Sequence, residues 1–255
     1  HNMAVDAALL QAADEQPAAP VLRIYRWSEP TVSLGYFQTA GPAAVDAPLR
    51  GCPQVRRLTG GGAILHHHEL TYSCVIPRSH PVKDNPLQLY QLMHQAISEA
   101  LQACGARTGF RADLPVPDQD QADKPEPFLC FRRSDPHDLA ACGQTARHHP
   151  KITGSAQRRR RGTILQHGSI LLRASPLLPD TPGVCDLFPK FNVSGFAGML
   201  PGHLAAAIAV AQNESVYTER ELEIAFPSFR EEDIPASRPT VGTAATTAVE
   251  STFLR

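Results

Sequence analysis

Alternating apolar and polar residues predict that β-strands dominate the first two thirds of the chain. Residues 21–27, with the sequence VLRIYRW, alternate as a half-buried strand does. Short runs rich in apolar and β-branched residues, bounded by glycine, proline or polar residues, indicate further strands. The strands expected in this way are 21–27, 31–37, 63–65, 70–76 and 163–172, with a hairpin formed by 139–142 and 151–153.

The clearest helix is predicted over residues 85–104, where apolar residues recur on one stripe at helical spacing. Asn85 is a suitable N-cap, Pro86 fits the first turn, and Gly105 fits the exit of the chain from the helix. Further helices are expected at 3–11 and within 189–230, the latter with a cap at Thr218.

Strands and helices that intermix without strict alternation favour an α+β fold. Residues 110–127 are rich in proline and aspartate, which predicts a loop. Residues 233–255 are mostly small, polar or proline residues without periodicity, so we expect a loose tail after a single domain over 1–232. No separate accessory domain is expected beyond residue 232.

The composition of the 255 residues is typical of a globular protein. Hydrophobic residues make up 42%, enough for a sizeable core, and the net charge is −1. A net charge this close to zero provides no general electrostatic attraction to nucleic acid or to an anionic membrane, so neither is expected as a partner. The sequence shows no signal peptide and no apolar run of transmembrane length, so we expect a cytoplasmic protein. The six cysteines lack zinc-ribbon spacing and are expected to be reduced.

A glycine-rich loop stands out in the segment 56–66, which reads RRLTGGGAILH. Gly60, Gly61 and Gly62 allow a positive φ and a close approach of the backbone to a ligand, whose acyl or carboxyl group the N–H groups can line. The loop fits neither a Walker P-loop nor a dinucleotide fingerprint. The alternative interpretation is a flexible turn between two strands.

A cluster of histidines follows the loop. His66 and His68 would share one face of a strand and could both reach a metal ion. The spacing indicates no third ligand, so no metal site is predicted.

Two later motifs complement the glycine loop. Residues 151–157 read KITGSAQ, and residues 166–171 read QHGSIL. In this order, the three segments resemble the catalytic domain of the biotin/lipoate protein ligase superfamily, within its lipoate ligase and octanoyltransferase branch. The resemblance implies a mixed β-sheet flanked by helices, as in the class II synthetase-like fold, and a catalytic domain over residues 1–232.

The resemblance also implies roles for individual residues. Lys151 would polarise the acyl carbonyl and stabilise developing negative charge. Cys130, in the pair Cys-Phe about twenty residues earlier, resembles the nucleophile of octanoyltransferases that carry a loop cysteine. The residues expected to bind substrate are Arg56, Arg57, Gly60, Gly61, Gly62, Ala63, His66, Gly154, Ser155, Ala156, Gln157, His167 and Gly168.

The surroundings of Cys130 support a reactive thiol. Arg132 and Arg133 follow it directly, and Lys151 could fold close. Nearby cations increase the thiolate fraction of a cysteine and thereby its nucleophilicity. The alternative is a buried loop cysteine without a chemical role.

These expectations lead to a ping-pong acyl transfer. Cys130 would take an octanoyl group from an acyl carrier protein and pass it to a lysine of a lipoyl-accepting domain. Such acceptors include the glycine cleavage H protein and the E2 subunit of 2-oxoacid dehydrogenases. Forming an amide from a thioester is downhill, so no cofactor is expected. The acyl chain would need an apolar slot, for which Ile64, Leu65 and Val75 are candidates.

Three alternatives remain open at this point. An ATP-dependent lipoate ligase of the same fold would need no cysteine, and ATP would then be required. Transfer between two lipoyl domains would use the same chemistry as transfer from a carrier protein. A non-catalytic module would bind a carrier or lipoyl domain without a covalent intermediate.

A run of four arginines at 158–161 has two interpretations. It is either a solvated hairpin tip or a patch for docking an acidic carrier protein.

Overall fold

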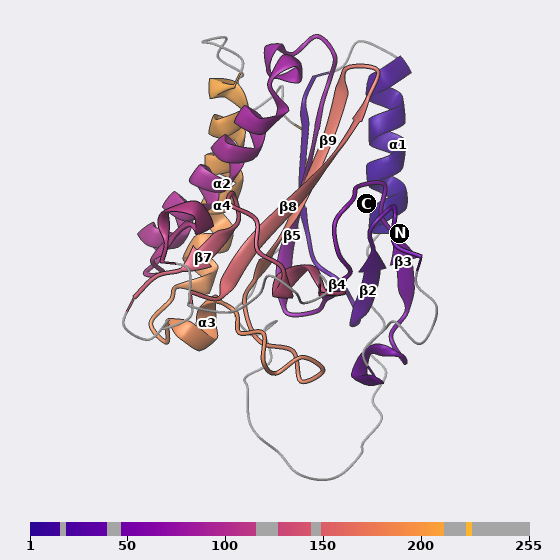
Figure 1. Ribbon diagram of the computed structural model, residues 1–255. Helices are drawn as coiled ribbons and strands as arrows, with labels where there is room; N and C mark the ends of the chain where they lie inside the picture. Colours follow the sequence, from indigo (N-terminus) through magenta and orange to yellow (C-terminus); the bar gives the residue numbers. More distant parts are fainter. Residues whose placement is uncertain (16–18, 40–46, 116–126, 144–148, 212–222, 226–255) are drawn as a thin grey trace.

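The computed structural model describes residues 1–15, 19–39, 47–115, 127–143, 149–211 and 223–225 (Figure 1). The tail expected at 233–255 and the cap expected at Thr218 lie outside these residues. The described chain forms two β-sheets and four α-helices, and the predicted α+β fold with a mixed sheet is confirmed.

The larger sheet has seven strands in the order β10-β1-β5-β9-β8-β7-β6. Neighbouring strands are antiparallel, apart from the parallel pair β1 and β10. Its strands are β1 (Val21–Tyr25), β5 (Glu69–Ile76), β6 (Thr108–Phe110), β7 (Leu139–Ala141), β8 (Lys151–Arg160), β9 (Thr163–Leu171) and β10 (Glu223–Ala225).

The smaller sheet carries the glycine loop. Its order is β3-β2-β4, with β2 (Thr31–Leu34), β3 (Gln54–Arg56) and β4 (Ile64–His66). Strand β2 is parallel to β3 and antiparallel to β4. The predicted loop therefore leaves the edge strand β3 and returns as β4 on the opposite edge.

The helices lie on both sides of the larger sheet, with α2 and α4 together and α1 apart from them (Figure 1). Their bounds are α1 (Asn2–Glu15), α2 (Pro86–Ala103), α3 (Val184–Leu187) and α4 (Val193–Val210). Short 3-10 turns occur at Ala47–Leu49 (η2), Pro81–Asp84 (η3), Arg111–Asp113 (η4) and Cys130–Arg132 (η5).

Helix α2 begins as its sequence predicts. The side chain of Asn85 accepts a hydrogen bond of 3.2 Å from the backbone N–H of Gln88, and Pro86 stands in the first turn. This cap satisfies a backbone donor that the first turn of a helix leaves without a partner.

The helical expectation for 189–230 is only partly correct. Helix α4 fulfils it, but residues 223–225 form a strand beside β1. Pairing with an open sheet edge is a tertiary effect that local sequence does not reveal. By length and composition α4 would suffice to cross a membrane, with a mean hydropathy of 1.5 over 18 residues. Here it buries Phe196, Leu200 and Leu204 in the main core, which accounts for its apolar character.

A second, smaller core joins the loop that carries Cys130 to the smaller sheet. It unites residues from β2, β4 and the two segments around Leu129 and Leu178. Leu129 forms an isolated parallel bridge with Ala63, directly after the three glycines. The cysteine loop is thus packed against the glycine loop, although about 65 residues separate them in the sequence.

Candidate active site

Cys130 is held beside the glycine loop by backbone hydrogen bonds. Its N–H donates to the carbonyl of Ala63 at 2.7 Å, and the N–H of Ala63 donates to the carbonyl of Phe128 at 2.9 Å. The half-buried Cys130 opens the 3-10 turn η5. These bonds give a loop cysteine a defined position.

Lys151, the first residue of β8, approaches Cys130 as the sequence predicts. Its Nζ lies 3.7 Å from Cys130 Sγ and 3.4 Å from the Cys130 carbonyl oxygen. The same Nζ lies 5.4 Å from the centre of the Phe131 ring. An ammonium at this distance stabilises a thiolate and can also reach a reacting carbonyl.

Asp138 completes this arrangement and was missed in the sequence. Its Oδ2 lies 2.7 Å from Lys151 Nζ, and the residue is 2% exposed. It stands immediately before β7, where a register shift at Leu139 and Ala140 interrupts the pairing with β8. The predicted hairpin of 139–142 and 151–153 already implied that these two segments are neighbours. The register shift, which the sequence does not reveal, determines that Asp138 faces Lys151.

Burial and ion pairing act on Asp138 in opposite directions. Burial raises the pKa of Asp138, while the Lys151 ammonium lowers it, and the net effect is a raised pKa. The Lys151 ammonium therefore favours the ionised form of Asp138, and the Asp138 carboxylate in turn holds the Lys151 side chain in place. Asp138 positions the Lys151 ammonium beside Cys130.

Because Gly154 has no side chain, the end of the Lys151 side chain can occupy the space beside it. A Cβ atom at this position would lie 2.5 Å from Lys151 Cε and 2.7 Å from Nζ. The glycine of the KITGSAQ motif thus allows the lysine side chain to fold back over its own strand.

A cavity of about 390 Å³ opens next to Cys130, between the glycine loop and the strands β5, β8 and β9. It brings together ten of the residues expected from the sequence. They are Arg57, Gly60, Gly61, His66, Cys130, Gly154, Ser155, Ala156, His167 and Gly168. The candidate slot residue Ile64 also lines it, whereas Val75 packs elsewhere, in a core cluster with Leu10 and Leu165.

Four expected binding residues do not line this cavity, and all four have structural contacts instead. Arg56 donates to the carbonyls of Gly35 and Gln38, at 3.0 and 2.7 Å. Gln157 donates to the carbonyl of Pro86 and to Gln166 Oε1, both at 2.7 Å.

The remaining two, Gly62 and Ala63, shape the loop itself. A Cβ atom on Gly62 would lie 2.6 Å from Arg133 Nε. Ala63 lines a second cavity, which shares Ile64 with the first. Sequence proximity to a motif did not distinguish the residues that line the first cavity from those that support it.

Arg57 shapes the glycine loop from within. Its guanidinium donates to the carbonyls of Gly60 and Gly62, at 3.0 and 2.8 Å, and to the carbonyl and hydroxyl of Ser33, at 2.9 and 2.6 Å. Burial lowers the pKa of Arg57 to about 10, a shift that an ionised Cys130 opposes. Arg57 therefore remains a cation at neutral pH and adds positive charge near the thiol.

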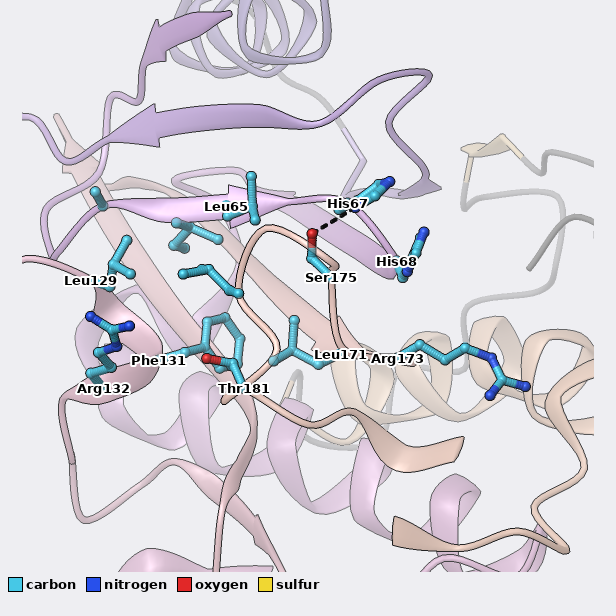
Figure 2. A pocket seen from close by; sticks show the side chains of 13 residues that line it. Leu65, His67, His68, Leu129, Phe131, Arg132, Leu171, Arg173, Ser175 and Thr181 are labelled. Carbon is cyan, nitrogen blue, oxygen red and sulfur yellow. Dashed lines mark hydrogen bonds between the residues drawn. The ribbon is translucent and has the colours of Figure 1, made fainter. Parts of the chain in front are cut away.

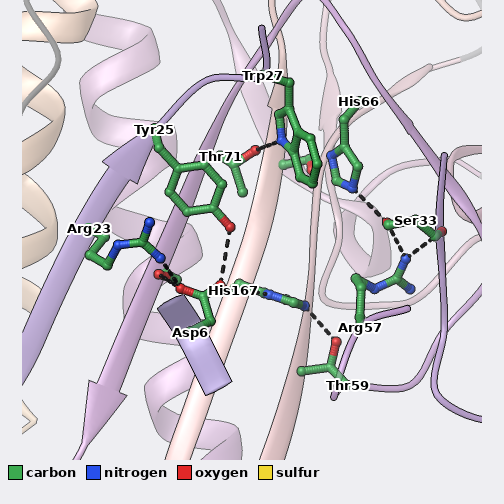
Figure 3. A network of polar contacts seen from close by, with 12 residues as sticks. Asp6, Arg23, Tyr25, Trp27, Ser33, Arg57, Thr59, His66, Thr71 and His167 are labelled. Carbon is green, nitrogen blue, oxygen red and sulfur yellow. Dashed lines mark hydrogen bonds and ion pairs between the residues drawn. The ribbon is translucent and has the colours of Figure 1, made fainter. Parts of the chain in front are cut away.

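The two histidines of the cavity belong to a buried polar network (Figure 3). His66 lies between Ser33 Oγ at 2.6 Å and Glu69 Oε1 at 2.7 Å, and its ring stacks on Trp27 with centroids 4.1 Å apart. These contacts fix the ring as part of the cavity wall.

The position of His66 also bears on the metal interpretation. His68 contacts the carbonyl of Ala174 at 3.2 Å and does not share the partners of His66. Among the described residues, no group of three or more His, Cys, Asp or Glu side chains is arranged to hold a metal ion.

His167 connects the cavity to helix α1. Its Nε2 lies 2.6 Å from Thr59 Oγ1, and its Nδ1 lies 3.6 Å from Asp6 Oδ2. Burial lowers the pKa of His167. Burial acts to raise the pKa of Asp6, but His167 and Arg23 outweigh it and the net pKa is lowered. Asp6 is thus a carboxylate that anchors α1 to the wall of the cavity.

A second hydrogen-bond chain holds Ser155 at the cavity wall. His94 Nδ1 bonds to the carbonyl of His137 at 2.7 Å, and Nε2 lies 2.6 Å from Ser155 Oγ. Burial lowers the pKa of His94 to about 3, so the ring is neutral at pH 7. A neutral ring that donates through Nδ1 accepts from the Ser155 hydroxyl at Nε2. His94 was missed because it lies next to the apolar stripe of α2, where a histidine carries no local signal.

Comparisons with known proteins show the family that the chain is similar to. The family model described as the lipoyl protein ligase A/B catalytic domain matches residues 1–178. Octanoyltransferase LipM of Staphylococcus epidermidis is 34% identical over 232 residues, covering 89% of this chain and 79% of the relative. Octanoyltransferase LipM of Geobacillus kaustophilus is 39% identical over 176 residues, covering 67% of this chain and 60% of the relative.

Solved structures show the same fold at low sequence identity. A bi-partite lipoate protein ligase from Thermoplasma acidophilum superimposes with a TM-score of 0.55 and 17% identity, covering 91% of this chain and 83% of that structure. LipL1 of P. falciparum, solved in complex with lipoate, gives a TM-score of 0.54 and 14% identity, covering 88% and 62%.

Proposed function

The chain belongs to the lipoyl protein ligase A/B catalytic domain family, and from this premise we propose that it is an octanoyltransferase acting through an acyl thioester on Cys130. The single observation that carries the proposal is the approach of Lys151 Nζ to Cys130 Sγ, at 3.7 Å, beside the cavity that Cys130 lines. The relatives named octanoyltransferase support the choice of acyl group.

In the first half-reaction the Cys130 thiolate attacks the carbonyl carbon of an octanoyl thioester. The C–S bond to Cys130 forms, and the carbonyl oxygen takes up the negative charge near the Lys151 ammonium. The bond to the donor sulfur then breaks. The departing thiolate takes a proton from Lys151 and leaves as a thiol, and the octanoyl group remains on Cys130.

In the second half-reaction the neutral ε-amine of an acceptor lysine attacks the Cys130 thioester. An amide forms, the Cys130 thiolate departs, and the proton lost by the amine restores the Lys151 ammonium. Atoms and charges balance over the two steps, and the cycle consumes no ATP.

The surroundings of Cys130 suit this chemistry. The cavity of about 390 Å³ places the apolar side chain of Ile64 and the backbone of Gly60 and Gly61 where an acyl chain can lie. Asp138 holds Lys151 in position through an ion pair of 2.7 Å. The proposed donor is an acyl carrier protein, and the proposed acceptor is a lipoyl-accepting domain.

The proposal is tested by intact-protein mass spectrometry after incubation with octanoyl carrier protein in the absence of ATP. We expect one octanoyl group on the wild type and none on Cys130→Ser. Cys142→Ser is the matched control and should acquire the adduct, because Cys142 lies outside the cavity.

A wild type without an adduct would overturn the proposal. Activity that requires ATP and free acid, and that survives Cys130→Ser, would identify an ATP-dependent ligase. Binding of a lipoyl domain without any covalent intermediate or product would identify a non-catalytic module.

A further inference from the structure

A second cavity, of about 430 Å³, adjoins the first, and Figure 2 shows the side chains that line it. Ile64 lines both cavities. Cys130 lines the first cavity, while its neighbours Leu129 and Phe131 line the second. The nucleophile therefore stands where the two cavities adjoin.

The middle of the second cavity is apolar. Leu65, Leu171, Leu178 and Phe131 line it, and the first three side chains are otherwise buried. A surface of this kind accommodates aliphatic carbon but offers no hydrogen bonds.

His67 and Ser175 form a polar pair on the side of the cavity away from Leu129, while Arg132 and Thr181 lie near Leu129 (Figure 2). His67 Nδ1 lies 2.9 Å from Ser175 Oγ at the wall of the cavity (Figure 2). Burial lowers the pKa of His67 to about 4, so its ring is neutral at pH 7. A neutral imidazole and a hydroxyl can form hydrogen bonds with an uncharged amide group.

Arg173 lines the cavity at the end opposite Leu129 and Arg132 (Figure 2). Its Nε is buried and has no hydrogen-bond partner among the described residues, and its Nη1 lies 4.0 Å from Asp186 Oδ1. A guanidinium with unused donors is suited to bind a phosphate group.

We propose that the second cavity holds the phosphopantetheine arm of the acyl donor, with its thioester at Cys130 and its phosphate at Arg173. The inference rests on the proposed function. It gives a position to the arm of the donor, which the proposed function does not. A thioester extends from its carbonyl in two directions, so a nucleophile that attacks it needs space on two sides. The acyl chain occupies the first cavity, and the arm occupies the second.

The order of groups along the arm matches the order along the cavity. From its sulfur the arm runs through two amides to a branched aliphatic segment, and ends in a phosphate. From Cys130 the cavity runs past apolar side chains to the pair His67 and Ser175, and ends at Arg173.

The first test is direct binding of 4′-phosphopantetheine, measured by isothermal titration calorimetry without any acyl group. We expect saturable binding to the wild type that weakens about tenfold in Arg173→Gln, because a charge-assisted hydrogen bond to the phosphate is lost. Leu178→Trp should block binding by filling the channel. Lys190→Gln, an exposed change of the same kind, should bind like the wild type. Absence of binding to the wild type, or equal binding by Leu178→Trp, would overturn the inference.

The second test compares two octanoyl thioesters as acyl donors to Cys130, followed by mass spectrometry. One carries the full phosphopantetheine arm, and the other carries N-acetylcysteamine, which lacks the phosphate and the branched segment. The wild type should acylate more efficiently with the full arm by at least about tenfold, and Arg173→Gln should lose most of this preference.

The outcomes separate the inference from the proposed function. Equal use of the two donors by the wild type would overturn the inference while leaving the cysteine chemistry intact. Binding of 4′-phosphopantetheine without acylation by either donor would support the cavity and reject the acyl-enzyme route. If ATP binds in the channel in place of 4′-phosphopantetheine, the cavity serves a nucleotide and the inference is overturned.

Discussion

At the scale of single residues, three side chains define the proposed chemistry. Cys130 supplies the sulfur, Lys151 the positive charge, and Asp138 the carboxylate that holds this charge in place. Each comes from a different segment, and each segment is held by backbone pairing. The arrangement thus depends on the fold more than on any one motif.

Asp138 is a positioning residue, and Asp138→Asn tests this role. The amide keeps the size of the side chain but removes the negative charge that holds the Lys151 ammonium. We expect slower acylation of Cys130 and a change in the acid limb of the pH–rate profile, because the carboxyl group of Asp138, whose pKa is raised chiefly by burial, no longer titrates.

The exposed residue Asp113 provides the matched control for this change. Asp113→Asn should leave both the rate and the pH profile as in the wild type. If Asp138→Asn lowers the rate without moving the profile, its role is limited to supporting the local structure.

Gly154→Ala tests the space that the lysine needs. The added methyl would overlap the end of the Lys151 side chain, which can move, while the backbone of β8 stays in place. We expect a folded protein whose acylation rate falls on the order of a hundredfold, as misplacement of a catalytic group by about 1 Å can cause.

A glycine in helix α4 serves as the control. The methyl added in Gly198→Ala meets nothing within 4 Å, so activity should be unchanged. Wild-type activity in Gly154→Ala would show that Lys151 does not need its present position.

At the scale of elements, helix α2 offers the clearest energetic prediction. Asn85→Ala removes the bond to the Gln88 N–H and should lower the free energy of unfolding by about 1 kcal/mol. Urea denaturation measures the change. Gln91→Ala, on the exposed face of the same helix, should change it by only a few tenths of a kcal/mol. An equal loss in both variants would mean that the cap does not contribute.

The hairpin of β8 and β9 tests one of the two interpretations of the arginine run, namely that it forms a hairpin tip. Arg161 and Gly162 form its turn, with φ values of 47° and 91°, so the predicted hairpin tip is confirmed. Arg160 and Arg161 approach the buried Asp14 of α1, at 3.3 and 3.7 Å. Arg160 lies nine positions after Lys151 along β8, which corresponds to about 30 Å in an extended strand. Docking of an acidic carrier at the tip remains a prediction, and the tip is remote from Cys130.

At the scale of the whole molecule, buried neutral histidines predict sensitivity to acid. The pKa values of His67, His80, His94 and His167 are all lowered, in each case chiefly by burial. Below pH 6.5 these histidines become protonated in the unfolded chain before they do so in the folded one. The unfolded state then binds more protons, so stability is full above pH 6.5 and falls as the pH falls.

For His94 the effect can be given a magnitude. With a folded pKa of about 3, this residue should reduce the free energy of unfolding by roughly 2 kcal/mol between pH 7 and pH 5. Urea denaturation across this range measures the slope, which should become shallower in His94→Gln. His203→Gln, on the surface of α4, is the control and should keep the wild-type slope. The same slope in His94→Gln would show that other groups cause the acid sensitivity.

The sequence by itself determined the elements and the family. Periodicity and capping located most strands and helix α2, because these signals are local and repeat along one segment. The glycine loop and the KITGSAQ motif indicated the family, because their residues and order along the chain are specific to it, and the resemblance implied the proposed roles of Cys130 and Lys151.

Only the tertiary structure decided which side chains meet. Asp138, His94 and Arg173 carry no local signal, since their roles depend on a register shift, a burial depth and a cavity formed by distant segments. Arg56 and Gln157 lie within the motifs yet point to backbone carbonyls and to Gln166. A motif specifies the backbone that passes a site, whereas packing between segments far apart in the sequence determines which of its side chains enter that site.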